Sequence, residues 1–183
     1  MNKKIRVITG TAKNKRLKAP RIEGFRAVQG VAKASLFSIL GEKIEDSVCL
    51  DLFSGSGNLG IEALSRGAGH CTFIDEEPRA IKTIEENLRN CNLLEKSEIV
   101  RKNAVKFAGD APRNYDVIFL DPFYEDTSHK FLMQNLESIL EEDGTIIFFH
   151  GKRLDLEKTL ENTNLKLIDQ RRFGKSYFSL IKA

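Results

Sequence analysis

The chain has 183 residues, of which 41% are hydrophobic and 30% charged, a composition typical of one soluble globular domain with a sizeable core. No apolar run approaches the ~20 residues of a membrane helix, and the N-terminus lacks the apolar core of about 7–15 residues that marks a secretory signal. We therefore expect a single domain over residues 1–183 and a cytoplasmic location. Three cysteines without paired spacing and three scattered histidines predict neither disulfides nor a metal site.

The net charge of +3 is unevenly distributed along the chain. Eight of the 29 lysines and arginines lie in residues 1–21, which contain no acid, so the rest of the chain carries 21 basic against 26 acidic groups. A basic arm on a mildly acidic body is typical of a protein that binds a polyanion, above all nucleic acid. A solvated tail is the alternative, but Ile5, Val7 and Ile8 alternate with the charges and favour a short β-hairpin.

The remaining elements follow in a regular order. Residues 31–40 have the apolar spacing of a helix, and the clearest later helices are expected at 77–93 and 128–140. Strands are expected at 48–53, 71–75, 97–102, 115–121 and 144–150. This alternation predicts a mostly parallel sheet with helices on both faces. The last two strand-like runs, 166–173 and 176–183, are separated only by Gly-Lys and should pair as an antiparallel hairpin.

A glycine loop follows the strand at 48–53. Gly55, Gly57 and Gly60 stand between that strand and the start of a helix, a pattern typical of loops that bind adenine cofactors, although a glycine-rich turn without a ligand also fits. Asp51 lies in the strand just before the loop. A carboxylate suits the sulfonium and ammonium groups of S-adenosylmethionine better than the pyrophosphate of NAD, so we expect S-adenosylmethionine as the cofactor.

Polar residues also follow the next two strands. Asp75 could hold both ribose hydroxyls through its two carboxylate oxygens, and this would serve NAD or S-adenosylmethionine equally. The amide of Asn103 could bind the adenine edge, and a plain turn residue is the alternative there. The neighbours expected to complete the cofactor site are Phe53, Glu76 and Ala104.

The strand at 115–121 ends on Asp121, followed by Pro122, Phe123 and Tyr124. An exocyclic base amine is a poor nucleophile because its lone pair is delocalised into the ring. The Asp121 carboxylate and the Pro122 carbonyl could accept its two N–H bonds and direct the lone pair toward a methyl donor. The rings of Tyr124 and Phe123 could stack on a base turned out of the nucleic acid. A strand end leading into a helix is the alternative interpretation.

In this order, "DLFSGSGNLGIEALSRGA", "FIDEE" and "FLDPFY" resemble class I methyltransferases that modify exocyclic amines. With "RVITGTAKNKRLKAP" and "LFSIL", the chain resembles the bacterial 16S rRNA guanine-N2 methyltransferases of the RsmD type from about residue 5 to 182. The resemblance implies a Rossmann-like fold with a seven-stranded sheet, S-adenosylmethionine as methyl donor, and 16S rRNA in a 30S subunit or assembly intermediate as substrate. We expect the enzyme to be a monomer that needs neither a metal nor a membrane.

The chain departs from the family pattern in two segments. Phe123 replaces the second proline of the usual DPPY or DPPF, and "RAVQGVAKASLF" replaces a stretch close to RPTTDRVREALF. Methylation of adenine N6, a non-catalytic RNA-binding relative and an NAD-dependent oxidoreductase therefore stay open as alternatives. Residues 1–28 are expected to form an RNA-contacting extension. The residues expected to contact RNA are Lys13, Lys15, Arg16, Lys18, Arg26, Arg171 and Arg172.

Overall fold

The computed structural model describes residues 5–123 and 129–183. A two-stranded hairpin opens the chain, formed by β1 (Ile5–Arg6) and β2 (Arg16–Leu17). The other strands are β3 (Val48–Leu52), β4 (His70–Asp75), β5 (Ser97–Arg101), β6 (Tyr115–Leu120), β7 (Leu140–Gly151), β8 (Lys166–Phe173) and β9 (Ser176–Lys182). The helices are α1 (Gly30–Leu40), α2 (Asn58–Ser65), α3 (Pro78–Cys91), α4 (Ala104–Gly109), α5 (Lys130–Ser138) and α6 (Leu156–Leu160), with 3-10 turns η1 (Gly41–Ile44) and η2 (Leu94–Lys96).

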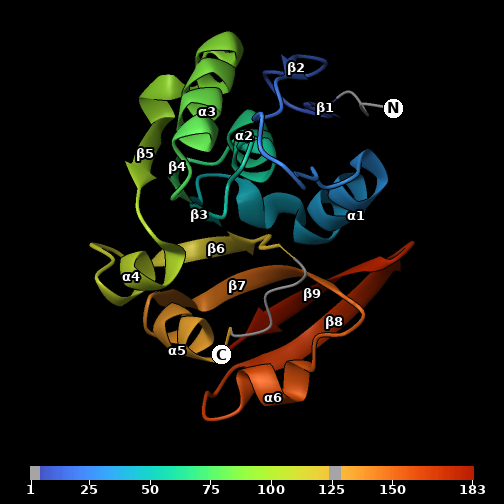
Figure 1. Ribbon diagram of the computed structural model, residues 1–183, viewed down its shortest axis with the longest axis vertical. Helices are drawn as coiled ribbons and strands as arrows, with labels where there is room; N and C mark the ends of the chain where they lie inside the picture. Colours follow the sequence, from blue (N-terminus) through green and yellow to red (C-terminus); the bar gives the residue numbers. More distant parts are fainter. Residues whose placement is uncertain (1–4, 124–128) are drawn as a thin grey trace.

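Within the described residues, seven strands form one sheet in the order β5-β4-β3-β6-β7-β9-β8. The pairs from β5 to β7 are parallel, whereas β9 is antiparallel to both β7 and β8. The predicted fold class is therefore confirmed, including the antiparallel hairpin at the C-terminal end and the short N-terminal hairpin (Figure 1). The element bounds differ by a few residues. The largest difference is at β7, which begins at Leu140, whereas a helix was expected up to residue 140 and the strand only from residue 144.

Helices cover both faces of the sheet, and each face has its own core. On one face α1, α2 and α3 pack around Phe37, Phe73 and Phe119. On the other face α4, α5 and α6 pack around Phe107 and Phe148 (Figure 1). The strands are apolar on both sides because both sides are buried, as expected for a parallel sheet. No helix in the part of the chain that the structure describes is long and apolar enough to cross a membrane.

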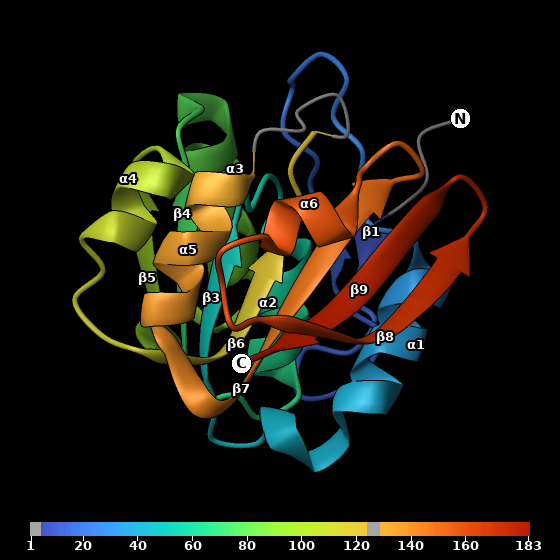
Figure 2. The ribbon, with the colours of Figure 1, turned by 90° about the horizontal axis from the view of Figure 1, so that it is seen from below.

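The winding of the sheet reverses between β3 and β6, which lie side by side (Figure 2). Strands β4 and β5 follow on one side of β3, and β7 follows on the far side of β6. Open α/β sheets bind ligands in the crevice at the carboxyl ends of the strands at such a reversal. Leu52 pairs with Leu120, so the following residues, Phe53 and Asp121, come level at this carboxyl edge.

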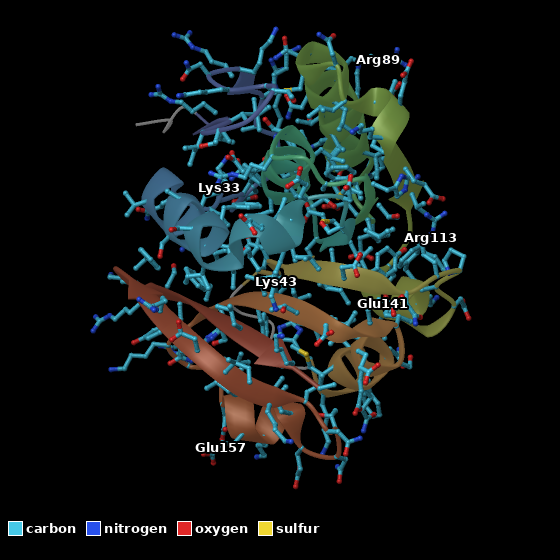
Figure 3. The ribbon with its side chains drawn as sticks, turned by 180° about the vertical axis from the view of Figure 1, so that it is seen from behind. Lys33, Lys43, Arg89, Arg113, Glu141 and Glu157 are labelled. Atoms are coloured by element: carbon cyan, nitrogen blue, oxygen red, sulfur yellow. The ribbon has the colours of Figure 1, made fainter. Side chains whose placement is uncertain are left out.

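The N-terminal hairpin is fixed to α2 by a buried carboxylate. Glu62 accepts hydrogen bonds from the amides of Ile8 and Thr9 at 2.8 and 3.0 Å. Its Oε2 lies 2.8 Å from the ammonium of Lys33, which is 1% exposed and also donates to the carbonyl of Arg6 at 2.8 Å. Figure 3 shows Lys33 on α1, facing the hairpin. The basic extension is therefore docked on the domain through α1 and α2.

Candidate active site

The glycine loop after β3 turns through three left-handed residues. Phe53, Gly55 and Gly57 have φ values of 57°, 55° and 73°. A left-handed phenylalanine is uncommon, and such strain tends to occur at ligand sites. The hydroxyl of Ser54 donates to the Asp51 carbonyl at 2.5 Å and accepts from the Ile74 amide at 3.0 Å, and the Ser54 amide donates to the Ile74 carbonyl at 3.1 Å. The loop is thus held in a fixed shape against β4.

The glycines of this loop have different structural roles. A Cβ on Gly60 would lie 2.4 Å from the Phe73 ring, so glycine lets α2 pack closely on β4. A Cβ on Gly55 would lie 2.7 Å from the ring of Phe25, which covers the loop. A Cβ on Gly24 would come within 3.9 Å of Phe123. The segment before α1 therefore lies over both the loop and the residues after β6.

Asp51 is a buried carboxylate under the glycine loop. It is 2% exposed, and its Oδ2 accepts the amide of Gly60 at 2.9 Å. Burial raises the pKa of Asp51 well above its usual value, and the charges of Asp121 and Asp75 raise it further. No cation among the described residues lowers the pKa of Asp51, Asp75 or Asp121. A bound sulfonium or ammonium would lower these pKa values again, so the three carboxylates fit a positively charged ligand.

Asp75 connects the end of β4 to the glycine loop. Its Oδ2 accepts the amide of Gly55 at 2.9 Å, and its Oδ1 accepts the amide of Glu77 at 3.0 Å. Burial raises the pKa of Asp75 in spite of these two hydrogen bonds. Each carboxylate oxygen retains a further lone pair. Asp75 can therefore still accept both ribose hydroxyls, as the sequence predicts.

Asn103 is largely committed to the protein itself. It is the N-cap of α4, and its Oδ1 accepts the amides of Val105 and Lys106 at 3.1 and 3.3 Å. Its Nδ2 donates to Glu76 Oε2 at 3.2 Å. Ala104, the first helical residue, is buried. These contacts agree with the alternative that Asn103 is a structural residue of the turn before α4. One N–H of its side-chain amide has no partner among them and could still bind an adenine edge.

Asp121 directly follows β6 at the same edge of the sheet. Burial raises the pKa of its carboxyl to about 7, so it is close to half ionised at neutral pH. The Pro122 that follows is buried, whereas Phe123 is 58% exposed. Tyr124 lies outside the described residues. The Asp121 carboxylate is therefore placed next to the glycine loop with an exposed aromatic ring beside it.

A small recess, partly open to solvent, adjoins this motif, and its enclosed space is about 10 Å³, roughly that of one water position. Its walls are Pro122, Phe123, His129, Phe148, Phe149, His150, Gly151 and Leu154. The ring nitrogens of His150 lie 3.0 Å from the Gly151 carbonyl and 2.9 Å from the Ser179 hydroxyl. Because a carbonyl only accepts, Nδ1 carries the proton and Nε2 accepts from Ser179. Burial lowers the pKa of His150, which favours this neutral form.

His150 was not among the predicted site residues. One available signal was that it ends an apolar strand, as Asp51, Asp75 and Asp121 do at or near the ends of theirs. Phe25 and Glu62 were also missed, and neither had a local signal. The structure brings Asp51, Phe53, Asp75 and Asp121 to one edge of the sheet.

The predicted RNA-binding residues fall into two groups. Lys13, Lys15, Arg16, Lys18 and Arg26 are exposed in the N-terminal segment, where the Lys18 ammonium pairs with Glu86 at 2.9 Å. Arg171 and Arg172 are exposed on β8, the edge strand at the end of the seven-stranded sheet away from β5.

A family model described as "Conserved hypothetical protein 95" matches residues 5–182. The chain belongs to this family. It is the RsmD family, so the resemblance inferred from the motifs is confirmed. The Bacillus subtilis protein named "Putative rRNA methyltransferase YlbH" is 37% identical over 161 residues, which cover 85% of this chain and 88% of that protein.

Two further matches come from Escherichia coli. Ribosomal RNA small subunit methyltransferase D of strain K12 is 31% identical over 140 residues, which cover 76% of this chain and 68% of that protein. A solved structure described as "Putative methyltransferase yhhF" matches with a TM-score of 0.83 at 25% identity and covers 98% of this chain and 97% of that one. This member of the RsmD family is therefore a class I methyltransferase, and the predicted cofactor, S-adenosylmethionine, is confirmed.

Proposed function

We propose that this RsmD family member transfers a methyl group from S-adenosylmethionine to the N2 amine of a guanine in 16S rRNA. The observation that carries the proposal is the position of Asp121 and Pro122. They follow β6 at the point where the sheet reverses, level with the glycine loop after β3. Two acceptors at this point suit an exocyclic amine, and the relatives named rRNA methyltransferases support RNA as the substrate.

S-adenosylmethionine supplies an activated methyl group on a sulfonium, so the protein has mainly to bind and align. The left-handed turn at Gly55 and Gly57 lets the backbone approach the ligand. Asp75 accepts the ribose hydroxyls, and Asp51 contributes negative charge and holds the Gly60 amide in place. Phe53, Glu76, Asn103 and Ala104 form the remaining cofactor wall in this proposal.

The target amine is held by Asp121 and the Pro122 carbonyl. Both accept its N–H bonds, which localises the nitrogen lone pair toward the methyl group. After transfer the nitrogen is cationic, and the Asp121 carboxylate takes the excess proton. A group with a pKa of about 7 is suited to take a proton in the active site and to release it to water afterwards. Phe123, with Tyr124, stacks on the base.

The basic extension binds the rRNA backbone in this proposal. Its exposed lysines and arginines match a polyanion, and its docking through Glu62 and Lys33 fixes those charges relative to the site. We propose a monomer that acts on a 30S subunit or an assembly intermediate in the cytoplasm. Size-exclusion chromatography with light scattering measures the molar mass in solution and so tests whether the protein is a monomer.

The proposal is tested with purified protein and 30S particles from a strain that lacks the gene. We expect calorimetry to detect S-adenosylmethionine binding, and nucleoside mass spectrometry to detect N2-methylguanosine formed by the wild type but not by Asp121→Ala. N6-methyladenosine would instead indicate the adenine alternative. Binding of rRNA without any methylation, unchanged by Asp121→Ala, would indicate a non-catalytic relative and overturn the proposal.

A further inference from the structure

A row of three side chains crosses the sheet from the recess to its edge. His150 on β7 is in register with Tyr177 on β9, and Tyr177 is in register with Arg172 on β8. Residues in direct register on neighbouring strands point to the same face of a sheet. Figure 2 shows the three strands running side by side, with the β8–β9 hairpin at the end of the sheet. The row therefore leads outward from the wall of the recess.

The two rings in this row are stacked. The centroids of His150 and Tyr177 are 5.7 Å apart, and the ring planes differ by 9°. Both nitrogens of His150 are hydrogen-bonded, to Gly151 and to Ser179, and Ser179 also accepts the side-chain amide of Gln170 at 3.1 Å. These contacts hold the imidazole in one orientation, so it supports the ring of Tyr177. Tyr177 is partly exposed, and Arg172 beyond it is exposed.

The neighbouring arginine faces the other way. Arg171 is in register with Phe178, which is fully buried in the core on the face covered by α1, α2 and α3. Its Nε also lies 2.8 Å from the carboxylate of Asp169, which neutralises its charge. The Nε of Arg172 donates to the Gly174 carbonyl at 2.9 Å, which leaves its positive charge uncompensated by that contact. Of the two arginines predicted to contact RNA, the geometry thus favours Arg172.

A braced aromatic ring next to a guanidinium has the chemistry to bind one nucleotide of a single strand. The ring offers a face on which any base can stack, and the guanidinium can pair with a phosphate through two parallel hydrogen bonds. Lys152 and Arg153, which follow the recess residue Gly151, are exposed and add positive charge nearby.

We propose that Tyr177 and Arg172 form a subsite for the nucleotide adjacent to the methylated one. The target base lies against Pro122 and Phe123 at the open side of the recess, the neighbouring base stacks on Tyr177, and its phosphate pairs with Arg172. His150 is a positioning residue that braces Tyr177. This inference rests on the proposed function, because it assumes that the methylated RNA base is held beside Pro122 and Phe123.

The test compares Tyr177→Ala, Tyr177→Phe, Arg172→Ala and the matched control Arg171→Ala. Methylation of 30S particles from a strain lacking the gene is measured at several salt concentrations. We expect Tyr177→Ala to lower kcat/KM about tenfold, mainly through KM, and Tyr177→Phe to stay within about twofold because the ring is retained. Arg172→Ala should reduce the slope of log(kcat/KM) against log salt by about 1, whereas Arg171→Ala should leave the slope unchanged.

Two further measurements keep a folding defect apart from a binding defect. S-adenosylmethionine affinity, measured by calorimetry, should be the same in all four variants and the wild type. Charge reversals Arg172→Glu and Arg171→Glu affect exposed residues and should not disturb the core, and only Arg172→Glu should weaken 30S binding. If the Tyr177 and Arg172 variants match the Arg171 control while the wild type methylates normally, the subsite is wrong and the proposed function stands. If the wild type methylates nothing, the proposed function fails; weaker 30S binding by Arg172→Glu alone would still support an RNA contact there.

Discussion

Asp121, at the end of β6, lies close enough to Asp51 on β3 for its negative charge to raise the pKa of the Asp51 carboxyl. With Asp75 on β4, these residues form a group of three buried or partly buried carboxylates at one edge of the sheet, and burial raises the pKa of each. The group is most strained electrostatically when all three are ionised. A cation bound between them would relieve this repulsion.

The affinity for S-adenosylmethionine should therefore increase with pH. The folded carboxylates are partly protonated at low pH because their pKa values are raised, and a cationic ligand must displace those protons. We expect several-fold tighter binding at pH 8 than at pH 6, measured by calorimetry. S-adenosylhomocysteine lacks the sulfonium charge and should show a weaker dependence. Equal dependence for the two ligands would contradict this account.

Replacement of Asp121 by asparagine should separate chemistry from cofactor binding. Asparagine retains one acceptor but neither the charge nor the capacity to take a proton, so we expect kcat to fall by about 10²–10⁴-fold. S-adenosylmethionine should still bind. The wild-type profile of kcat/KM against pH should fall on the acid side near pH 7, because Asp121 must be ionised.

The acid limb gives an internal check on this assignment. With saturating S-adenosylmethionine, the sulfonium charge should move the limb to a lower pH in the kcat profile. If the acid limb lies at the same pH in the kcat/KM profile for S-adenosylmethionine and in the kcat profile, another group controls the rate.

The substitution Asp121→Asn should also stabilise the fold at alkaline pH. The pKa of Asp121 is about 7 in the folded state against an ordinary 3.8, so the folded state holds this proton more tightly than the unfolded state. Its contribution to stability is present below about pH 4, decreases as pH rises, and is lost above about pH 7. Asp121→Asn should therefore raise the free energy of unfolding at pH 8 by on the order of 1–3 kcal/mol, and by much less at pH 4. Urea denaturation at both pH values measures this difference.

Gly60→Ala should destabilise the protein through packing. The new Cβ would lie 2.4 Å from the Phe73 ring and 2.7 Å from the sulfur of Cys71, both in the buried face of β4. Overpacking of this kind costs about 1–3 kcal/mol, measured by thermal or urea unfolding. Gly30→Ala is the control, because nothing lies within 4 Å of its Cβ position and its φ is not left-handed. A Gly60→Ala protein as stable as the control would show that α2 can move away from β4 at little cost.

Glu62→Gln should release the N-terminal hairpin. The substitution leaves the buried ammonium of Lys33 without its ionic partner and weakens the hydrogen bonds to Ile8 and Thr9. Loss of one member of a buried pair costs about 3–5 kcal/mol. The exposed pair of Glu85 and Arg89 on α3 is the control, and Glu85→Gln should change stability by less than about 1 kcal/mol.

Detachment of the hairpin has its own readout. Limited proteolysis should cut the Glu62→Gln protein within residues 5–20 faster than the wild type. Equal rates of cleavage in the two proteins would mean that the hairpin is held mainly by other contacts, such as those of Ser65 to Thr9 and Ala12.

The sequence by itself determined the order of strands and helices, the glycine loop and the motif that begins at Asp121. These are local features: the apolar period of each element reports its own conformation, and glycine and proline mark turns within a few residues. The sequence also predicted that Asp51, Asp75 and Asp121 each lie at or near the end of a strand. Parallel pairing of β3 with β4 and with β6 then brings these ends to one edge of the sheet.

Only the tertiary structure decided which distant residues share a surface. Phe25 lies on Gly55 and Glu62 holds the amides of Ile8 and Thr9, yet the partners are some 30 and about 54 residues apart and no short pattern couples them. Asn103 caps α4 because helix geometry aims two free amides at its side chain. The tertiary structure also distinguishes Arg171 from Arg172, which look equivalent in the sequence. Successive side chains of a strand point to opposite faces of the sheet, so Arg171 and Arg172 face opposite ways. The pairing in the order β7-β9-β8 places Arg172 on the same face as Tyr177 and the recess, and Arg171 on the other face.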